Sequence, residues 1–234
     1  MYYQLFNDNN KYNVDNINHL DTLNNKYNVQ SINIFNSNLI VLPNLQKFIN
    51  LESFNCSNNQ LTQLPLLPNK LTELYCYNNQ LNQLPILPSN LNFLNCDNNL
   101  LTQLPLLPDN LISLNCIYNQ LTQLPDLPSN LKTLSCEHNK LTQLPKLSIN
   151  LLFLSCYNNQ LTQLPLLPNK LRFIKCYNNY KNLHKDIIHY KSLYSYKKYK
   201  KYKYIYTLND LLNYTIENYY YIYIIKYYDK YNNY

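Results

Sequence analysis

The stretch from Leu71 to Asn90 reads LTELYCYNNQLNQLPILPSN, and the chain repeats it with little change on both sides. Full copies begin at Leu51, Leu71, Leu91, Leu111, Leu131 and Leu151, and a partial copy begins at Leu171. The shared pattern is L-x-x-L-x-C-x-x-N-x-L-T-Q-L-P-x-L-P-x-N. A period this strict predicts a solenoid, in which each unit contacts only its neighbours.

Each unit divides into a short strand and an extended return segment. Side chains alternate along a strand, so Phe54 and Cys56 are expected to point into the core. Ser53, Asn55 and Ser57 then point outward. Stacked units form one parallel sheet on the concave face. The return segment T-Q-L-P-x-L-P carries two prolines three residues apart, which excludes a helix and favours extended, polyproline-like backbone on the convex face.

This unit resembles the leucine-rich repeat, and its double proline and short period resemble the variety found in bacterial effector proteins that enter host cells. The resemblance covers Ile32 to about Tyr180 and implies a right-handed leucine-rich repeat solenoid. Some of these effectors carry a C-terminal ubiquitin-ligase domain with a catalytic cysteine. No cysteine follows Cys176 in this sequence, so that activity is not carried over.

The repeats divide the chain into three parts. Residues 1–30 do not fit the pattern and are predicted to be a helical N-terminal cap, because an uncovered solenoid end would expose a layer of leucines. Residues 31–180 are the solenoid, with one degenerate, six full and one partial repeat. Residues 181–234 are predicted to be a C-terminal cap or tail rich in Tyr and Lys, with a helix at about 208–228.

One asparagine per repeat stands where the strand bends into the core. A buried amide there can bond the backbone of its own turn and of the next turn, which otherwise lacks regular pairing. We therefore interpret this row as a structural ladder. Its members are Asn59, Asn79, Asn99, Asn119, Asn139, Asn159 and Asn179.

All seven cysteines occupy a single repeat position. A straight row of thiols does not offer zinc four converging ligands, and an odd count without an export signal argues against disulfides. We interpret them as small, reduced, buried hydrophobic residues. They are Cys56, Cys76, Cys96, Cys116, Cys136, Cys156 and Cys176.

The composition argues against an enzyme. The chain has no glycine, which removes the P-loop, the dinucleotide fingerprint and any glycine-built oxyanion loop. Asparagine is then expected at the left-handed turn positions that glycine would otherwise take. His138 is the only histidine in the repeats, and Glu137 precedes it. We interpret His138 and Glu137 as a solvated pair on the repeat surface. No catalytic residue, metal site, cofactor or small-molecule substrate is predicted.

Large aromatic residues gather at the outward positions of the concave sheet. Tyr75 and Tyr77 form one group, and a larger group lies near the C-terminal end of the repeats. Exposed aromatics grouped on such a face are typical of protein-binding hot spots. The candidate binding residues are Tyr75, Tyr77, Phe93, Ile117, Tyr118, Glu137, His138, Phe153, Tyr157, Phe173 and Tyr177. The alternative interpretation is that the second group is covered by the protein's own tail.

The tail also offers a different kind of surface. The net charge of the chain is +7, and residues 181–234 hold ten lysines against four acids. Interleaved with tyrosines, these lysines could bind nucleic-acid phosphates or an anionic membrane. A solvated cap edge is the simpler interpretation, because residues 181–234 contain no arginine and no nucleic-acid motif. The candidate phosphate-binding residues are Lys197, Lys198, Lys200, Lys201 and Lys203.

The ends of the chain favour an intracellular, soluble protein. The N-terminus MYYQLFNDNNKYN lacks the features of a secretory signal, and the apolar run from Tyr219 to Ile225 is too short to span a bilayer. We expect a cytoplasmic location, which includes the cytoplasm of a host cell. The leading hypothesis is a non-enzymatic adaptor that binds a partner protein through the concave face; the alternative is nucleic-acid or anionic-membrane binding through the tail.

Overall fold

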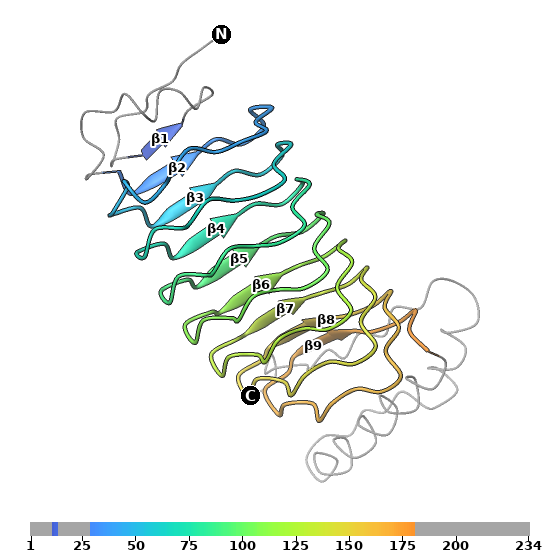
Figure 1. Cartoon of the computed structure of the whole chain (residues 1–234). Helices are drawn as coiled ribbons and strands as arrows, with labels where there is room; N and C mark the ends of the chain where they lie inside the picture. Colours follow the sequence, from blue (N-terminus) through green and yellow to red (C-terminus); the bar gives the residue numbers. More distant parts are fainter. Residues whose placement is uncertain (1–10, 14–28, 181–234) are drawn as a thin grey trace, which may run out of the picture.

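The computed structural model describes residues 11–13 and 29–180. Its strands form a single nine-stranded parallel sheet in which the strands follow the order of the chain (Figure 1). Each strand is three residues long. The strands are β1 (Lys11–Asn13), β2 (Ser31–Asn33), β3 (Ser53–Asn55), β4 (Glu73–Tyr75), β5 (Phe93–Asn95), β6 (Ser113–Asn115), β7 (Thr133–Ser135), β8 (Phe153–Ser155) and β9 (Phe173–Lys175). The predicted solenoid with a parallel sheet is confirmed.

The register of the sheet follows the sequence period. In β4 and β5, Glu73 lies opposite Phe93 and Leu74 lies opposite Leu94. The backbone pairing continues beyond the strand, where the Cys76 N–H donates to the Asn95 carbonyl at 2.9 Å. Residues at the same repeat position therefore form straight rows along the solenoid.

The sheet begins earlier than the sequence analysis expected. Strand β1, Lys11–Asn13, lies within the segment predicted to be a cap and pairs in parallel with β2. The helix predicted for the N-terminal cap and the whole of the predicted C-terminal cap or tail lie outside the described residues.

One apolar layer per repeat makes a continuous core. In the repeat that begins at Leu71, the side chains of Leu71, Leu74, Cys76 and Leu81 are fully buried, and the equivalent residues of every repeat join them in one cluster. No turn contains enough of this layer to fold alone, so the burial of each layer depends on the next.

The return segments contain neither helix nor strand in the described repeats, as the paired prolines predict. A tight turn closes each repeat, as in the bond from the Leu71 N–H to the Pro68 carbonyl at 3.1 Å. Ser148 replaces the second proline of one pair and keeps the turn. Its hydroxyl donates to the carbonyl of Ser129 at 2.7 Å, which satisfies the buried polar group that the substitution introduces.

The asparagine ladder is present, with one difference from the prediction. The side-chain amide of Asn119 donates to the carbonyls of Cys96 at 3.0 Å and Cys116 at 3.2 Å. Its Oδ1 accepts the N–H of Leu101 at 3.0 Å. The amide therefore joins its own turn to the preceding turn, not to the next one. A bond to the preceding turn satisfies buried backbone groups as well as a bond to the next turn would.

Asparagine also takes the left-handed position that glycine would otherwise fill. The residue just before each ladder asparagine has a φ between 49° and 55°. Asparagine occupies this position in most repeats, but Tyr118 (φ 49°) and His138 (φ 55°) replace it in two adjacent ones. A bulky side chain is uncommon in this conformation, so these two replacements need an explanation beyond the fold.

The seven cysteines are free and buried, as predicted. Their thiols lie in the core behind the sheet. The five thiols from Cys56 to Cys136 each donate to a carbonyl of the following strand. The Sγ of Cys96, for example, lies 3.4 Å from the carbonyl oxygen of Asn115. Burial raises the pKa of the thiols from Cys56 to Cys156 far above the ordinary cysteine value.

Candidate functional site

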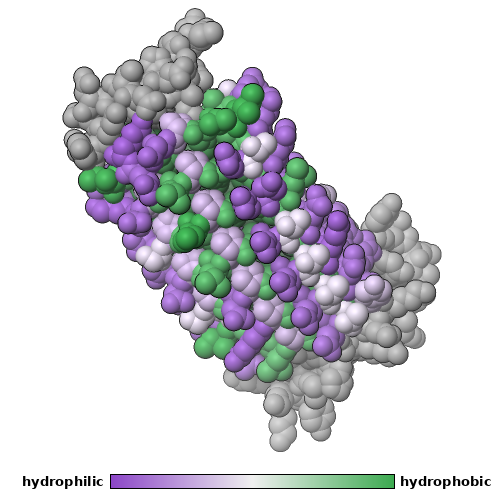
Figure 2. Space-filling model, in the orientation of Figure 1, coloured by the Kyte–Doolittle hydropathy of each residue, from purple (hydrophilic) through white to green (hydrophobic). Residues whose placement is uncertain are grey.

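The candidate site is the concave sheet face, which consists of four rows of outward-pointing residues. The first two rows come from the first and last residue of each strand. The third and fourth rows follow the buried cysteine, where the chain bends away from the sheet. In the repeat of β4 these positions are Glu73, Tyr75, Tyr77 and Asn78. Figure 2 shows apolar and polar side chains interspersed over the side of the solenoid seen in Figure 1.

Two rows carry stacked rings near the C-terminal end of the sheet. Phe153 and Phe173 stack with centroids 4.7 Å apart and an interplanar angle of 7°. Tyr157 and Tyr177 stack at 4.4 Å and 13°. Register explains both pairs, because equivalent residues of adjacent repeats are direct neighbours. The structure thus brings together the larger aromatic group predicted from the sequence.

The stacking continues toward the middle of the solenoid through His138. Its ring lies 4.0 Å from that of Tyr118 in a stacked arrangement and 5.2 Å from that of Tyr157 in an edge-on arrangement. Together with Tyr177, these residues form a continuous line of rings across four repeats. At the opposite end, Tyr77 packs against Phe35 with centroids 6.4 Å apart.

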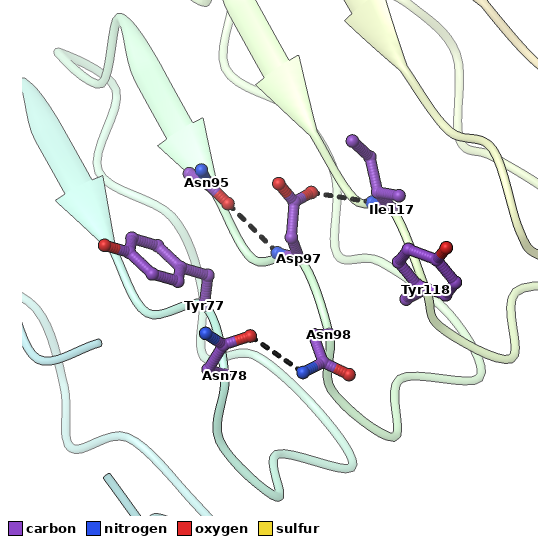
Figure 3. Close-up of a pocket in the computed structure, with 7 residues that line it drawn as sticks. All are labelled: Tyr77, Asn78, Asn95, Asp97, Asn98, Ile117 and Tyr118. Carbon is purple, nitrogen blue, oxygen red and sulfur yellow. Dashed lines mark hydrogen bonds between the residues drawn. The ribbon is translucent and has the colours of Figure 1, made fainter. Parts of the chain in front are cut away.

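An open hollow of about 610 Å³ lies between these two aromatic groups. Figure 3 shows the rings of Tyr77 and Tyr118 on opposite sides of Asp97, which stands between them. The residues that line the hollow are Tyr77, Asn78, Asn95, Asp97, Asn98, Ile117 and Tyr118. The hollow is therefore built by three consecutive repeats, with aromatic walls and a carboxylate between them.

The carboxylate of Asp97 is held in place by the backbone. Its Oδ1 accepts the N–H of Ile117 at 2.7 Å, and its own N–H donates to Oδ1 of Asn95 at 3.1 Å. Burial raises the pKa of Asp97 to about 6, with a smaller contribution from the negative charge of Glu137, although the Ile117 hydrogen bond opposes the rise. The site therefore holds a carboxylate in surroundings that disfavour its charge.

Exposed amides form a second ladder that ends at the hollow. The Nδ2 of Asn78 donates to Oδ1 of Asn58 at 2.6 Å, and the Nδ2 of Asn98 donates to Oδ1 of Asn78 at 2.7 Å. The next residue in this row is Tyr118, which has no amide to donate to Asn98. Within residues 29–180, no hydrogen bond to Oδ1 of Asn98 is formed. An acceptor therefore faces the edge of the hollow.

The Glu137 and His138 pair is not the solvated pair predicted from the sequence. Glu137 is only 8% exposed, and burial raises the pKa of its carboxyl, while a hydrogen bond from its own backbone and the positive charge of Lys175 act in the opposite direction. His138 packs between two tyrosines, stacked on Tyr118 and edge-on to Tyr157, and partial burial lowers the pKa of its ring. Glu137 is therefore not an exposed member of the face.

The other predicted binding residues lie on the face with different exposures. Phe93 (38%) and Tyr118 (54%) are exposed. Half-buried positions are taken by Tyr75, Tyr77, Ile117, His138, Phe153, Tyr157, Phe173 and Tyr177. Sequence reasoning missed Asp97 and Asn98. The sequence signal for Asp97 was a carboxylate in the row that follows the cysteines, where the other repeats hold serine, tyrosine, isoleucine or glutamate.

Several other expectations fall outside this face. The tail lysines from Lys197 to Lys203 lie outside the described residues. Among residues 11–13 and 29–180, no group of three or more His, Cys, Asp or Glu residues is arranged to hold a metal ion. The same part of the chain has no helix that could cross a membrane.

Comparison with solved structures gives strong matches to leucine-rich repeat proteins. YopM from Yersinia enterocolitica is 34% identical, with a TM-score of 0.63, over 65% of this chain and 34% of that chain. YopM from Yersinia pestis, a leucine-rich effector protein, is 37% identical, with a TM-score of 0.60, over 68% of this chain and 44% of that chain. The leucine-rich repeat domain of a Shigella effector is 29% identical, with a TM-score of 0.55, over 74% of this chain and 78% of that chain.

These similarities confirm the predicted resemblance to bacterial effector repeats and the predicted leucine-rich repeat fold. The chain spans between about a third and a half of the length of the two YopM structures. No protein-family model matches the sequence, and no curated protein matches it either.

Proposed function

We propose that this leucine-rich repeat solenoid of the bacterial effector type is a protein-binding module that receives its partner on the concave sheet face. Similarity to effector repeat proteins supports protein interaction as the general role. We propose binding without catalysis, and without a cofactor or small-molecule substrate.

The observation that carries this proposal is the concentration of rings on one face. Aromatic side chains dominate binding energy in protein interfaces because they bury a large area with few rotatable bonds. Phe93 and Tyr118 are exposed on this face, and stacking orders the rings from Tyr118 to Tyr177 before any partner arrives. Such ordering lowers the entropic cost of association.

The test is affinity capture with the full chain and two matched variants. The concave variant is Tyr75→Ala with Phe93→Ala, and neither residue lines the hollow. The control variant is Ile86→Ala with Leu106→Ala, which removes two exposed side chains (84% and 86%) from the return segments. We expect both variants to melt like the parent protein, and the concave variant alone to lose the captured protein. Equal capture by both variants would contradict the proposal.

The basic tail supports a second, weaker candidate: binding to nucleic acid or an anionic membrane. Its basis is the charge of residues 181–234, which hold ten lysines against four acids. Binding of this kind weakens steeply with added salt because counterions are released on association. Retention of the full chain on RNA or on phosphatidylserine vesicles should then fall between 50 and 200 mM salt, and replacing the five lysines from Lys197 to Lys203 by glutamine should abolish it.

A further inference from the structure

We propose that the hollow between Tyr77 and Tyr118 binds an arginine side chain of the partner protein. This inference rests on the proposed function, because it names the chemistry of what the concave sheet face receives.

The hollow has the walls that a guanidinium group requires. The rings of Tyr77 and Tyr118 stand on opposite sides of Asp97, and Ile117 adds an aliphatic surface (Figure 3). Tyr118 is fixed by stacking on His138 at 4.0 Å. Aromatic faces attract cations, and the planar guanidinium can stack on a ring while its edge makes hydrogen bonds. Lysine lacks this planar edge and is the weaker fit.

The polar groups left open in the hollow include two acceptors, the carboxylate of Asp97 and the Oδ1 of Asn98, beside the amide of Asn95 and the two tyrosine hydroxyls. The carboxylate of Asp97 keeps capacity beyond the bond it accepts from Ile117, since two oxygens can accept about four hydrogen bonds. The exposed amide ladder points its last acceptor, Oδ1 of Asn98, toward the Tyr118 side. Arginine carries five N–H donors and no acceptor, so it complements these two acceptors.

The charge of the face has the opposite sign to the charge of the chain. The net charge of the whole sequence is +7. On the four rows of the concave sheet face between residues 53 and 178, the charged residues other than the buried Glu137 are Glu73, Asp97 and Lys175. Lys175 is on β9, at the far end from Glu73. The hollow therefore lies within an acidic part of the face, which favours a basic occupant.

Two residues of the hollow reduce the stability of the unbound protein. Burial penalises the charge of Asp97 and raises its pKa. Tyr118 places a large side chain at a left-handed position that asparagine takes in most repeats. Other repeats fold with serine or isoleucine at the position of Asp97 and with asparagine at the position of Tyr118. Two energetically unfavourable residues in one hollow point to a function there. The positive charge of a bound arginine would compensate the buried negative charge of Asp97.

The test titrates the full chain with four short peptides and measures their binding by NMR. The peptides are acetyl-Gly-Ser-X-Ser-Gly-amide, where X is arginine, lysine, glutamine or citrulline, the last being the uncharged analogue of arginine. We expect the arginine peptide to shift the backbone N–H signals of Asp97, Asn98, Ile117 and Tyr118. Citrulline and glutamine should bind at least about tenfold more weakly, because the charge-assisted hydrogen bonds are lost.

Two variants make the test specific. Asp97→Asn keeps an acceptor for the Ile117 N–H and should weaken the arginine peptide about tenfold. Asp126→Asn, at an exposed aspartate of a return segment, should leave it unchanged. Equal binding of arginine and citrulline, shifts confined to other residues, or full binding by Asp97→Asn would each overturn the inference.

Capture separates this inference from the proposed function. Loss of the partner in the Tyr75→Ala, Phe93→Ala variant together with full capture by Asp97→Asn would leave concave binding standing and overturn the arginine site. Loss of the partner in both variants supports both proposals. Binding of the arginine peptide without any dependence of capture on the concave face would overturn the assignment of that arginine to the partner.

Discussion

The backbone N–H of Ile117 donates to the Oδ1 of Asp97 across 2.7 Å, and this bond spans two adjacent repeats. The carboxylate that receives it is nevertheless a costly residue, because burial raises its pKa from an ordinary 3.8 to about 6. A folded-state pKa above the unfolded value means that ionisation of Asp97 opposes folding. The bond orders the carboxylate without offsetting the loss of its hydration.

Asp97→Asn should therefore stabilise the protein at neutral pH. Well below the unfolded pKa of 3.8, at about pH 3, the carboxyl is mostly protonated in both the folded and the unfolded states, so the variant and the parent should nearly match. The penalty grows as the pH rises from about 4 to 6 and is then constant, at about 1 to 3 kcal/mol after allowance for partial exposure. Urea unfolding at about pH 3 and about pH 7.5 measures this difference.

The control for this prediction is Asp126→Asn, which changes the same charge on an exposed return segment. It should shift the unfolding midpoint by less than about 0.5 kcal/mol, as surface substitutions generally do. A parent protein that is more stable than Asp97→Asn at pH 7.5 would show that the Ile117 bond outweighs the cost of burial.

The asparagine ladder supports a second prediction. Asn119→Ala removes an amide that bonds the carbonyls of Cys96 and Cys116 and the N–H of Leu101. These backbone groups would be left buried without partners, so the free energy of unfolding should fall by roughly 1 to 3 kcal/mol. Gln120→Ala, one residue further along, should cost much less. Equal and negligible losses in urea unfolding would argue against the ladder.

The cysteines support a third prediction, about reactivity. The thiolate is the reactive form, and burial both hides the seven thiols and raises the pKa of those from Cys56 to Cys156. Titration with an aromatic disulfide reagent should be slow in native protein and complete in denaturant, with seven thiols released. Rapid reaction of all seven thiols under native conditions would contradict a stacked core.

Much of this fold could be predicted from the sequence because its period leaves little freedom. Phe54 and Cys56 had to face the core once the alternation was assigned, and every other repeat then followed. Strand β1 was not predicted, because Lys11–Asn13 carries no copy of the repeat pattern. Pairing with the edge of β2 depends on backbone groups, which the pattern of side chains does not reveal.

The candidate site could be predicted only in part. The rows of aromatic residues follow from the register, so the Tyr157 and Tyr177 stack was within reach. The burial of Glu137 could not be predicted, because the alternation of side chains assigns this position to the outward face. Asp97 escaped notice for the same reason: a carboxylate in a surface row is ordinary in sequence, and only its surroundings make it costly.

The last prediction concerns Phe153 and Phe173, whose rings stack at 4.7 Å on adjacent strands. Stacked aromatic pairs contribute about 0.5 to 1.5 kcal/mol beyond the area they bury. A double-mutant cycle with Phe153→Leu and Phe173→Leu should show a coupling of that size in the free energy of unfolding, because leucine keeps an apolar contact and removes the ring. Phe93 lies on β5, four strands from β9, and has no contact with Phe173 through the sheet. The cycle of Phe93→Leu with Phe173→Leu should therefore be additive, and a coupling near zero in the first cycle would show that the rings are neighbours without stabilising each other.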